Sequence, residues 1–183
     1  TVVQECGVGL VTLRRSGKHL AFAAPPSRRS APAPQQLARV AHALGLQEPQ
    51  IRAAQVLDNG PVFLTLLLSS QQDVLACQPD LQALRLLRIC AALVSVEENP
   101  ASPQLQVRAF GPHLGFDEDP VTGSLNAALA QWLIAEGIAP PTYVAAQGTC
   151  IGRAGRVHIE RDTGGQVWVG GESVTCIEGT VAL

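Results

Sequence analysis

An acidic loop that runs directly into an apolar segment constrains the fold of this chain more than any other feature. Residues 117–124 read Asp-Glu-Asp-Pro-Val-Thr-Gly-Ser, and Leu125 to Ile134 are almost wholly apolar. A helix that is apolar on nearly all sides is stable only when it is buried, and Gly137 is a typical helix stop. We therefore predict a helix over residues 122–136 that lies in the core, with a sheet curved around it.

The start of this helix has the residue types of an anion site. Pro120 suits a first helical position, and Asp119 or Thr122 can act as the cap. Gly123 allows a ligand group to approach the backbone closely. The unpaired N–H groups and the positive end of the helix dipole attract an anion. The same residues also describe a helix cap without chemistry, so both interpretations stay open at this point.

Motifs on both sides of the acidic loop resemble those of one protein family. They follow one another along the chain as Asp58-Asn59-Gly60, Arg108-Ala109-Phe110-Gly111-Pro112, Gly115 to Ser124, Gln147-Gly148, Ile151-Gly152-Arg153 and Val167 to Gly171. The chain resembles the C-terminal two thirds of the phenazine-biosynthesis PhzF-like family, which has the diaminopimelate-epimerase-like fold. The specific part is Glu-Asp-Pro-x-Thr-Gly-Ser; the glycine motifs alone are weak signals.

The resemblance implies an α+β fold in which a strongly curved, mostly antiparallel sheet is wrapped around a central buried helix. Residues 1–24 alternate like strands and would be the remnant of a first, similar lobe. The proline-rich residues 25–34 would connect the lobes, and residues 35–183 would form the second lobe. The sequence leaves open whether the final strand returns to the first lobe.

Periodicity and turn residues place the remaining elements. Helices are expected over residues 35–44 and 80–89. Strands are expected over residues 51–57, 61–69, 93–97, 105–110, 143–147, 156–160, 166–169, 173–177 and 180–183. His158, between two apolar strand residues, is expected to be exposed.

The resemblance also implies the site residues. Asp119 would lie beside the substrate as an acid or base, and Ser124 would help to hold the substrate carboxylate. The implied catalytic residues are Asp119 and Ser124, and the implied substrate-binding residues are Gly123, Ser124, Thr122, Asp58, Asn59 and Gly60. Asn-Gly is also the commonest hairpin turn, and the turn and the site are compatible interpretations.

The resemblance implies a cofactor-independent isomerase or epimerase that performs acid–base proton transfer on a small carboxylate-bearing substrate. Related racemases carry a cysteine where this chain has Glu118-Asp119-Pro120, so a two-cysteine mechanism is disfavoured. The family's catalytic glutamate and Cys-Gly-His-Ala-Thr segment are not found in this sequence. We therefore expect a chain that lacks the N-terminal catalytic segment and is inactive by itself. The alternative is a non-catalytic binding or interaction module that retains the lobe.

Composition excludes several other classes of protein. With 13 basic and 15 acidic residues the net charge is −2, which is no footprint for nucleic acid or an anionic membrane. No apolar run reaches the ~18 residues of a membrane span. Five cysteines without a Cys-x-x-Cys pair disfavour a disulfide framework or a zinc site and favour the cytoplasm. We expect no metal or cofactor, a homodimer, and the N-terminal segment as a possible further partner.

Overall fold

The computed structural model describes residues 1–97 and 103–182. Its strands are β1 Val2–Cys6, β2 Gly9–Ser16, β3 His19–Ala23, β4 Arg28–Ser30, β5 Ile51–Asp58, β6 Val62–Leu68, β7 Cys90–Val96, β8 Leu105–Phe110, β9 Thr142–Gln147, β10 Gly155–Arg161 and β11 Val167–Glu172. Its α-helices are α1 Pro34–Ala43, α2 Gln71–Ala76, α3 Leu81–Leu87 and α4 Gly123–Ala135. Short 3₁₀ turns lie at Glu48–Gln50, Pro112–Leu114 and Thr149–Ile151.

These strands form one sheet in the order β1-β2-β3-β11-β10-β9-β8-β7-β6-β5-β4. Neighbouring strands are antiparallel except for the parallel pairs β6–β7 and β8–β9. The α+β class and the mostly antiparallel sheet predicted from the sequence are therefore confirmed.

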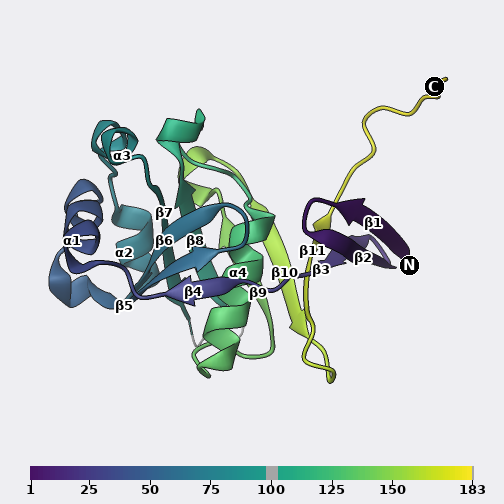
Figure 1. Ribbon diagram of the computed structural model, residues 1–183, viewed down its shortest axis with the longest axis horizontal. Helices are drawn as coiled ribbons and strands as arrows, with labels where there is room; N and C mark the ends of the chain where they lie inside the picture. The colour runs from purple at the N-terminus through teal and green to yellow at the C-terminus, as the bar shows by residue number, and fades with distance from the viewer. Residues whose placement is uncertain (98–102, 183) are drawn as a thin grey trace.

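Two apolar clusters cover the two faces of the sheet's central strands. On one face α4 packs with Trp132, Leu129 and Leu125 among strand residues such as Val94 and Val107. On the other face α1, α2 and α3 cover a separate cluster that includes Leu44, Val74 and Leu84. Figure 1 shows α1, α2 and α3 grouped at one end of the molecule and α4 beside β9 and β10. The central strands are therefore covered by helices on both faces.

Strand β7 shows why this arrangement demands an apolar sequence. Cys90, Ala92 and Val94 belong to the cluster around α4, whereas Ala91 and Leu93 belong to the cluster under α1–α3. Side chains alternate between the faces of a strand, so a strand covered on both faces reads as a continuous apolar run rather than an alternation.

The N-terminal strands extend the sheet through β3, which pairs with β11 over five residue pairs. Residues 2–10, which include β1, are exposed throughout. After β11 the chain leaves the sheet, and residues 173–182 have no regular structure and are exposed. In Figure 1 this tail runs away from the sheet.

Most predicted elements are present, and the main differences are as follows. The strands expected over 173–177 and 180–183 are absent in the described part of that stretch, and residue 183 lies outside the described residues. The stretch 25–34 is more than a connector, because Arg28–Ser30 pairs with β5. Helix α2 was not expected; Ser70 caps it by accepting a hydrogen bond from the backbone N–H of Asp73. The strand expected over 93–97 begins earlier, at Cys90.

Within the described residues, no helix has both the length and the apolar character needed to cross a bilayer. Helix α4 has 13 residues, well short of the ~20 that a membrane-spanning helix requires. Its apolar surface is explained by burial in the protein core.

We predict that Leu129→Ala lowers the free energy of unfolding by about 2–5 kcal/mol, because it opens a cavity in a close-packed core. Leu129 on α4 is fully buried. Leu86→Ala is the matched control, since Leu86 on α3 is 78% exposed and its loss should change stability by no more than about 0.5 kcal/mol. Denaturant unfolding of both variants measures the difference; equal effects would contradict the assigned core.

Candidate functional site

The three carboxylates of the acidic loop each have a different hydrogen-bond or ion-pair partner. Asp117 faces Arg85 at 3.4 Å on the surface. Glu118 turns inward and accepts two hydrogen bonds from Arg108, at 3.0 and 2.8 Å. Asp119 Oδ2 accepts a 2.7 Å hydrogen bond from the Thr122 hydroxyl. The other two carboxylates of the loop, Asp117 and Glu118, are thus each paired with an arginine, whereas Asp119 is held by a neutral hydroxyl.

The Arg108–Glu118 pair anchors the loop to the buried side of β8. The two side chains are only 5% and 8% exposed. Arg108 Nη1 also donates to the backbone carbonyls of Val74 and Cys77, at 3.2 and 2.6 Å. Burial by itself would lower the pKa of Arg108, but the hydrogen bonds and charge of Glu118 outweigh it and raise that pKa. Arg108 therefore stays charged and fixes the loop against α2.

Gln147, at the end of β9, holds the other side of the loop. Its side chain is fully buried. Its Oε1 accepts hydrogen bonds from the backbone N–H of Thr122 at 3.1 Å and from Asn126 Nδ2 at 2.9 Å. Its Nε2 donates to the carbonyl of Asp119 and to the Thr122 hydroxyl, both at 2.9 Å. One buried amide therefore makes contacts along the whole segment from Asp119 to the first turn of α4.

Two glycines allow β9 and β10 to approach this loop. A Cβ on Gly148, which has φ of +84°, would lie 2.8 Å from the carbonyl oxygen of Pro120. A Cβ on Gly155 would lie 2.6 Å from Val121 Cγ2 and 2.9 Å from the same carbonyl oxygen. Real Cβ atoms do not come this close, so glycine is required by packing. The Gln147-Gly148 motif seen in the sequence thus has a structural role beneath the acidic loop.

The helix start differs in detail from the sequence prediction. Helix α4 begins at Gly123 with Thr122 as the N-cap residue, so Pro120 precedes the helix and is not its first residue. Thr122 makes no side-chain cap hydrogen bond, because its hydroxyl donates to Asp119 instead. Asp119 is not the cap either. The N–H groups of Gly123 and Ser124 lie in the first turn, where a helix provides them no partner.

The structure brings the Asp58-Asn59-Gly60 turn to this helix start. Asn59 Nδ2 donates to the carbonyl oxygen of Ser124 at 3.2 Å. The turn itself is closed by a hydrogen bond from the N–H of Gly60 to Asp58 Oδ1 at 3.1 Å. The turn and site interpretations of Asn-Gly are thus compatible in space, and the predicted roles of these residues stay predictions.

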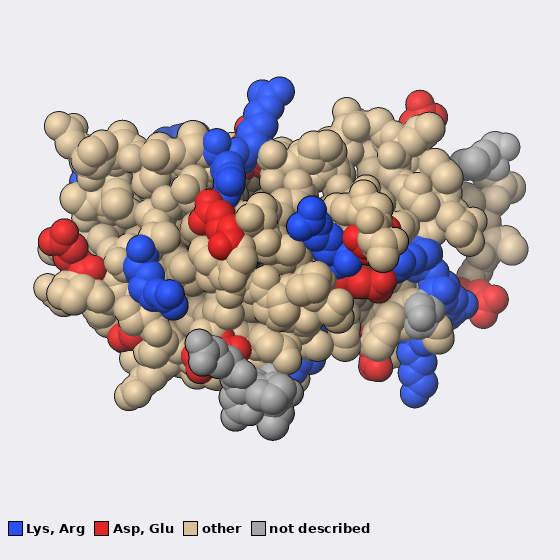
Figure 2. All heavy atoms as spheres, turned by 90° about the horizontal axis from the view of Figure 1, so that it is seen from below, with Lys and Arg blue, Asp and Glu red and all other residues tan. Residues whose placement is uncertain are grey.

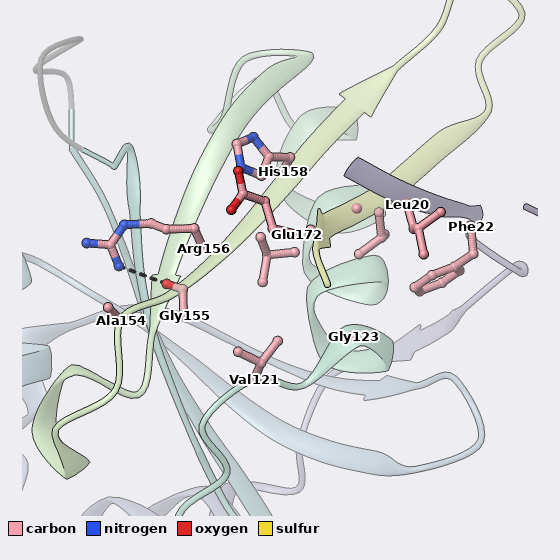
Figure 3. Close-up of a pocket in the computed structure, with 13 residues that line it drawn as sticks. Leu20, Phe22, Val121, Gly123, Ala154, Gly155, Arg156, His158 and Glu172 are labelled. Atoms are coloured by element: carbon pink, nitrogen blue, oxygen red, sulfur yellow. Dashed lines mark hydrogen bonds between the residues drawn. The ribbon is translucent and has the colours of Figure 1, made fainter. Parts of the chain in front are cut away.

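A cavity of about 570 Å³ opens beside the helix start (Figure 3). Gly123 is the predicted site residue that lines it, whereas Asp119 and Ser124 are not among its lining residues. Side chains from three other strands complete its wall, as Figure 3 shows: Leu20 and Phe22 from β3, Arg156 and His158 from β10, and Glu172 from β11. The cavity is therefore formed where the N-terminal strands meet the rest of the sheet.

A histidine pair in this region was not predicted. The rings of His19 and His158 lie 4.2 Å apart between centroids, and His19 Nε2 lies 3.8 Å from a carboxylate oxygen of Glu172. Burial and the neighbouring His19 lower the pKa of His158, while Glu172 opposes the shift. The expectation that His158 is exposed is wrong, because the β3–β11 pairing brings His19 against it. Nothing local in the sequence signals this long-range pairing.

The described residues contain no group of three or more His, Cys, Asp or Glu side chains arranged to bind a metal. The face drawn in Figure 2 carries separate basic and acidic groups among uncharged residues. On this face there is no continuous basic stripe of the kind that follows a phosphate backbone. The absence of a nucleic-acid partner stays a prediction.

Comparisons with known proteins agree with this geometry. The sequence profile of the PhzC-PhzF family, described as "Phenazine biosynthesis-like protein", matches residues 1–179. "Antisense-enhancing sequence 1" of Schizosaccharomyces pombe is 26% identical over 97% of this chain and 66% of its own length. "Uncharacterized isomerase YddE" of Escherichia coli is 29% identical over 67% of this chain and 45% of its own length. A crystal structure of a PhzF-family phenazine biosynthesis protein from Enterococcus faecalis has a TM-score of 0.71 at 22% identity, and the match covers 100% of this chain and 65% of that one.

The sheet and helix arrangement is the fold of the PhzF-like and epimerase-like proteins. The chain belongs to the phenazine biosynthesis-like (PhzC-PhzF) family, as the resemblance of its motifs indicated. It spans between 45% and 66% of the length of the relatives named above.

We predict that Glu118→Gln lowers the free energy of unfolding by about 3–5 kcal/mol, because it leaves the buried Arg108 charge uncompensated. Asp117→Asn is the matched control on the adjacent residue. Its partner Arg85 is exposed, so this change should alter stability by no more than about 1 kcal/mol. Denaturant unfolding of the two variants at neutral pH provides the comparison, and a small effect of Glu118→Gln would show that the pair is not buried in solution.

We predict that stability falls as the pH drops below about 6.5, the usual pKa of an unfolded histidine, and that part of this loss comes from His158. Its lowered pKa means that the unfolded chain binds a proton before the folded chain does. The contribution of His158 to the free energy of unfolding is therefore fully present above this pH and is lost as the pH falls below it. In melting curves recorded between pH 7.5 and 5, His158→Gln should reduce the fall of the melting temperature with decreasing pH. The control His42→Gln, at an exposed position on α1, should leave this pH dependence unchanged.

Proposed function

We propose that this protein is an isomerase or epimerase that moves a proton on a small carboxylate-bearing substrate without a cofactor. The observation that carries the proposal is the pairing of two features within one short segment. An oriented carboxylate, Asp119, lies immediately before a helix start whose first-turn N–H groups suit an anion.

The substrate carboxylate would bind at the N–H groups of Gly123 and Ser124. The positive end of the α4 dipole adds to these donors, and Asn59 fixes the carbonyl of Ser124 from the side. The same N–H groups can stabilise negative charge that develops on an enolate-like intermediate. Thr122, Asp58 and Gly60 would shape this subsite through the loop and the turn.

Asp119 would exchange a proton with the substrate carbon. One group removes a proton from a C–H bond, and the electron pair moves toward the carboxylate or an adjacent double bond. A second group then returns a proton to the opposite face of the same carbon, or to another carbon. Asp119 Oδ2 already accepts a hydrogen bond from Thr122, so Oδ1 would be the oxygen that acts.

The second proton-transfer group in this proposal is the glutamate that the family resemblance implies and that this sequence does not contain. The chain alone would then be inactive. Family membership and the name "Uncharacterized isomerase" carried by the E. coli relative support an isomerase for the whole protein.

Other parts of the proposal rest on the resemblance. They are a first lobe represented by residues 1–24, a connector over 25–34 that includes β4, a second lobe from residue 35, a homodimer and a cytoplasmic location. Light scattering of the purified protein would test the dimer, and a monomer at micromolar concentration would contradict it.

Solvent exchange tests the activity even while the substrate is unidentified. The protein encoded by the complete gene is incubated in D₂O with a panel of α-amino, α-hydroxy and unsaturated carboxylates, and deuterium at carbon is followed by NMR. The proposal expects incorporation into at least one compound, unchanged by a metal chelator. No incorporation across the panel, with carboxylates still binding, would favour the alternative of a non-catalytic binding module.

For the substrate so identified, we predict that Asp119→Asn lowers turnover by roughly 10²-fold or more, the scale of a positioned acid or base, with little change in affinity. Ser124→Ala should mainly weaken binding, because it removes the Ser124 hydroxyl, which would hold the substrate carboxylate together with the backbone N–H groups. Asp117→Asn is the control for loss of a loop carboxylate and should retain turnover. Wild-type turnover in Asp119→Asn would leave Asp119 with a structural role only; melting temperatures establish that each variant is folded.

A further inference from the structure

The buried amide of Gln147 has an orientation that its backbone partners decide. The N–H of Thr122 can only donate and the carbonyl of Asp119 can only accept. Gln147 must therefore direct its oxygen to Thr122 N and its nitrogen to Asp119 O, as the 3.1 and 2.9 Å distances require. A flipped amide would place the Gln147 nitrogen against the N–H of Thr122 and the Gln147 oxygen against the carbonyl of Asp119. Two donors would then face each other at one end and two acceptors at the other. This assignment does not depend on seeing hydrogen atoms.

The orientation of the amide then decides the direction of the Thr122 hydroxyl. Gln147 Nε2 has two protons; one points to Asp119 O and the other to Thr122 Oγ1, 2.9 Å away. Because Oγ1 accepts there, its own single proton is free to point elsewhere. Asp119 Oδ2 lies 2.7 Å from Oγ1 and is the acceptor that completes the chain.

We propose that Gln147 is a positioning residue that acts through the Thr122 hydroxyl to hold Asp119 with Oδ2 occupied and Oδ1 directed to the substrate. The relay runs from Gln147 Nε2 to Thr122 Oγ1 to Asp119 Oδ2. This inference rests on the proposed function for its catalytic meaning. The orientation of the Asp119 carboxylate can be measured independently of any substrate.

The surroundings of Gln147 make the relay rigid. Its side chain is fully buried, and Asn126 Nδ2 donates to the same Oε1 at 2.9 Å. The backbone of Asp119 is held on both sides, since its N–H donates to the carbonyl of Ala109 at 2.9 Å and its carbonyl accepts from Gln147. Rotation of the carboxylate about its own side-chain bonds is then the remaining freedom, and the Thr122 hydroxyl removes it.

A purely structural role for Gln147 would lead to a different experimental result. If the amide only ties β9 to α4, its loss lowers stability without changing the Asp119 side chain. Gln131 provides the comparison, because its amide also has four hydrogen bonds, two accepted from Ser27 and two donated to the carbonyls of Pro25 and Ala127. It ties α4 to the chain before β4, away from Asp119.

The test uses Gln147→Glu, Thr122→Val and Thr122→Ser, with Gln131→Glu as the control. Gln147→Glu keeps the shape and the acceptor but removes the donor to Thr122, so the hydroxyl can turn from Asp119 to the new carboxylate. Thr122→Val keeps the shape and removes the hydroxyl, and Thr122→Ser restores it. The Thr variants keep the question testable if Gln147→Glu does not fold.

The first readout is the NMR signal of the Thr122 hydroxyl proton, which is observable only when a hydrogen bond slows its exchange, together with the Asp119 side-chain conformation in crystals. We expect the signal and a single Asp119 conformer in the wild type and in Gln131→Glu. We expect a shifted signal and a second Asp119 conformer in Gln147→Glu, because the hydroxyl then donates to the introduced carboxylate, and a second Asp119 conformer in Thr122→Val. An unchanged hydroxyl signal and Asp119 conformer in Gln147→Glu would overturn the inference.

The second readout is turnover in the deuterium assay. Thr122→Val should lower kcat by about 10²-fold, the scale of a misplaced catalytic group, with KM within about twofold, and Thr122→Ser should recover most of kcat. An altered Asp119 conformation with full turnover would also overturn the positioning role. If Asp119→Asn is fully active, the proposed function fails, and the NMR and crystallographic readouts still decide whether Gln147 orients Asp119.

Discussion

The need to bury α4 is the constraint on which the rest of the structure depends. Trp132, Leu129 and Leu125 are at most 1% exposed, and each has its place in the cluster formed by one face of the sheet. A 13-residue helix with apolar residues on nearly all sides cannot remain at a surface. The start of α4 therefore has a fixed position next to the core, and the acidic loop that precedes the helix must be fixed there as well.

The loop before α4 is fixed from several directions because it enters the core at this point. Arg108 on β8 binds Glu118, Gln147 on β9 binds Asp119 and Thr122, and Gly155 on β10 lies against Pro120. Polar groups that enter an apolar interior need partners, and the hydrogen bonds of Arg108 and Gln147 provide them. The result is a short segment with little freedom, as the proposed site would require in order to orient a carboxylate and an anion together.

The predicted site residues have different structural positions. Asp119, Thr122, Gly123 and Ser124 are consecutive or nearly so, and Asn59 joins them through its contact with Ser124. The large cavity includes Gly123 but takes most of its wall from β3, β10 and β11. Sequence reasoning selected the first group because its motif is continuous. It did not predict that His19, His158 and Glu172 lie together, because only pairing between distant strands brings them together.

The sequence by itself determined the elements whose signals are local. The apolar run of α4 and the Asn-Gly turn each lie within a few consecutive residues, so periodicity and turn chemistry were sufficient. The Glu-Asp-Pro-x-Thr-Gly-Ser string, also continuous, carried the family resemblance. Only the tertiary structure decided that Pro120 precedes α4 and is not its first residue, and that the Thr122 hydroxyl donates to Asp119 instead of capping the helix. It also decided that residues 173–182 form no strand, that Glu118 pairs with Arg108 and that Gln147 holds the loop. These outcomes depend on hydrogen bonds and contacts between segments far apart in the chain, and local residue patterns do not encode which distant group will satisfy a given donor or acceptor.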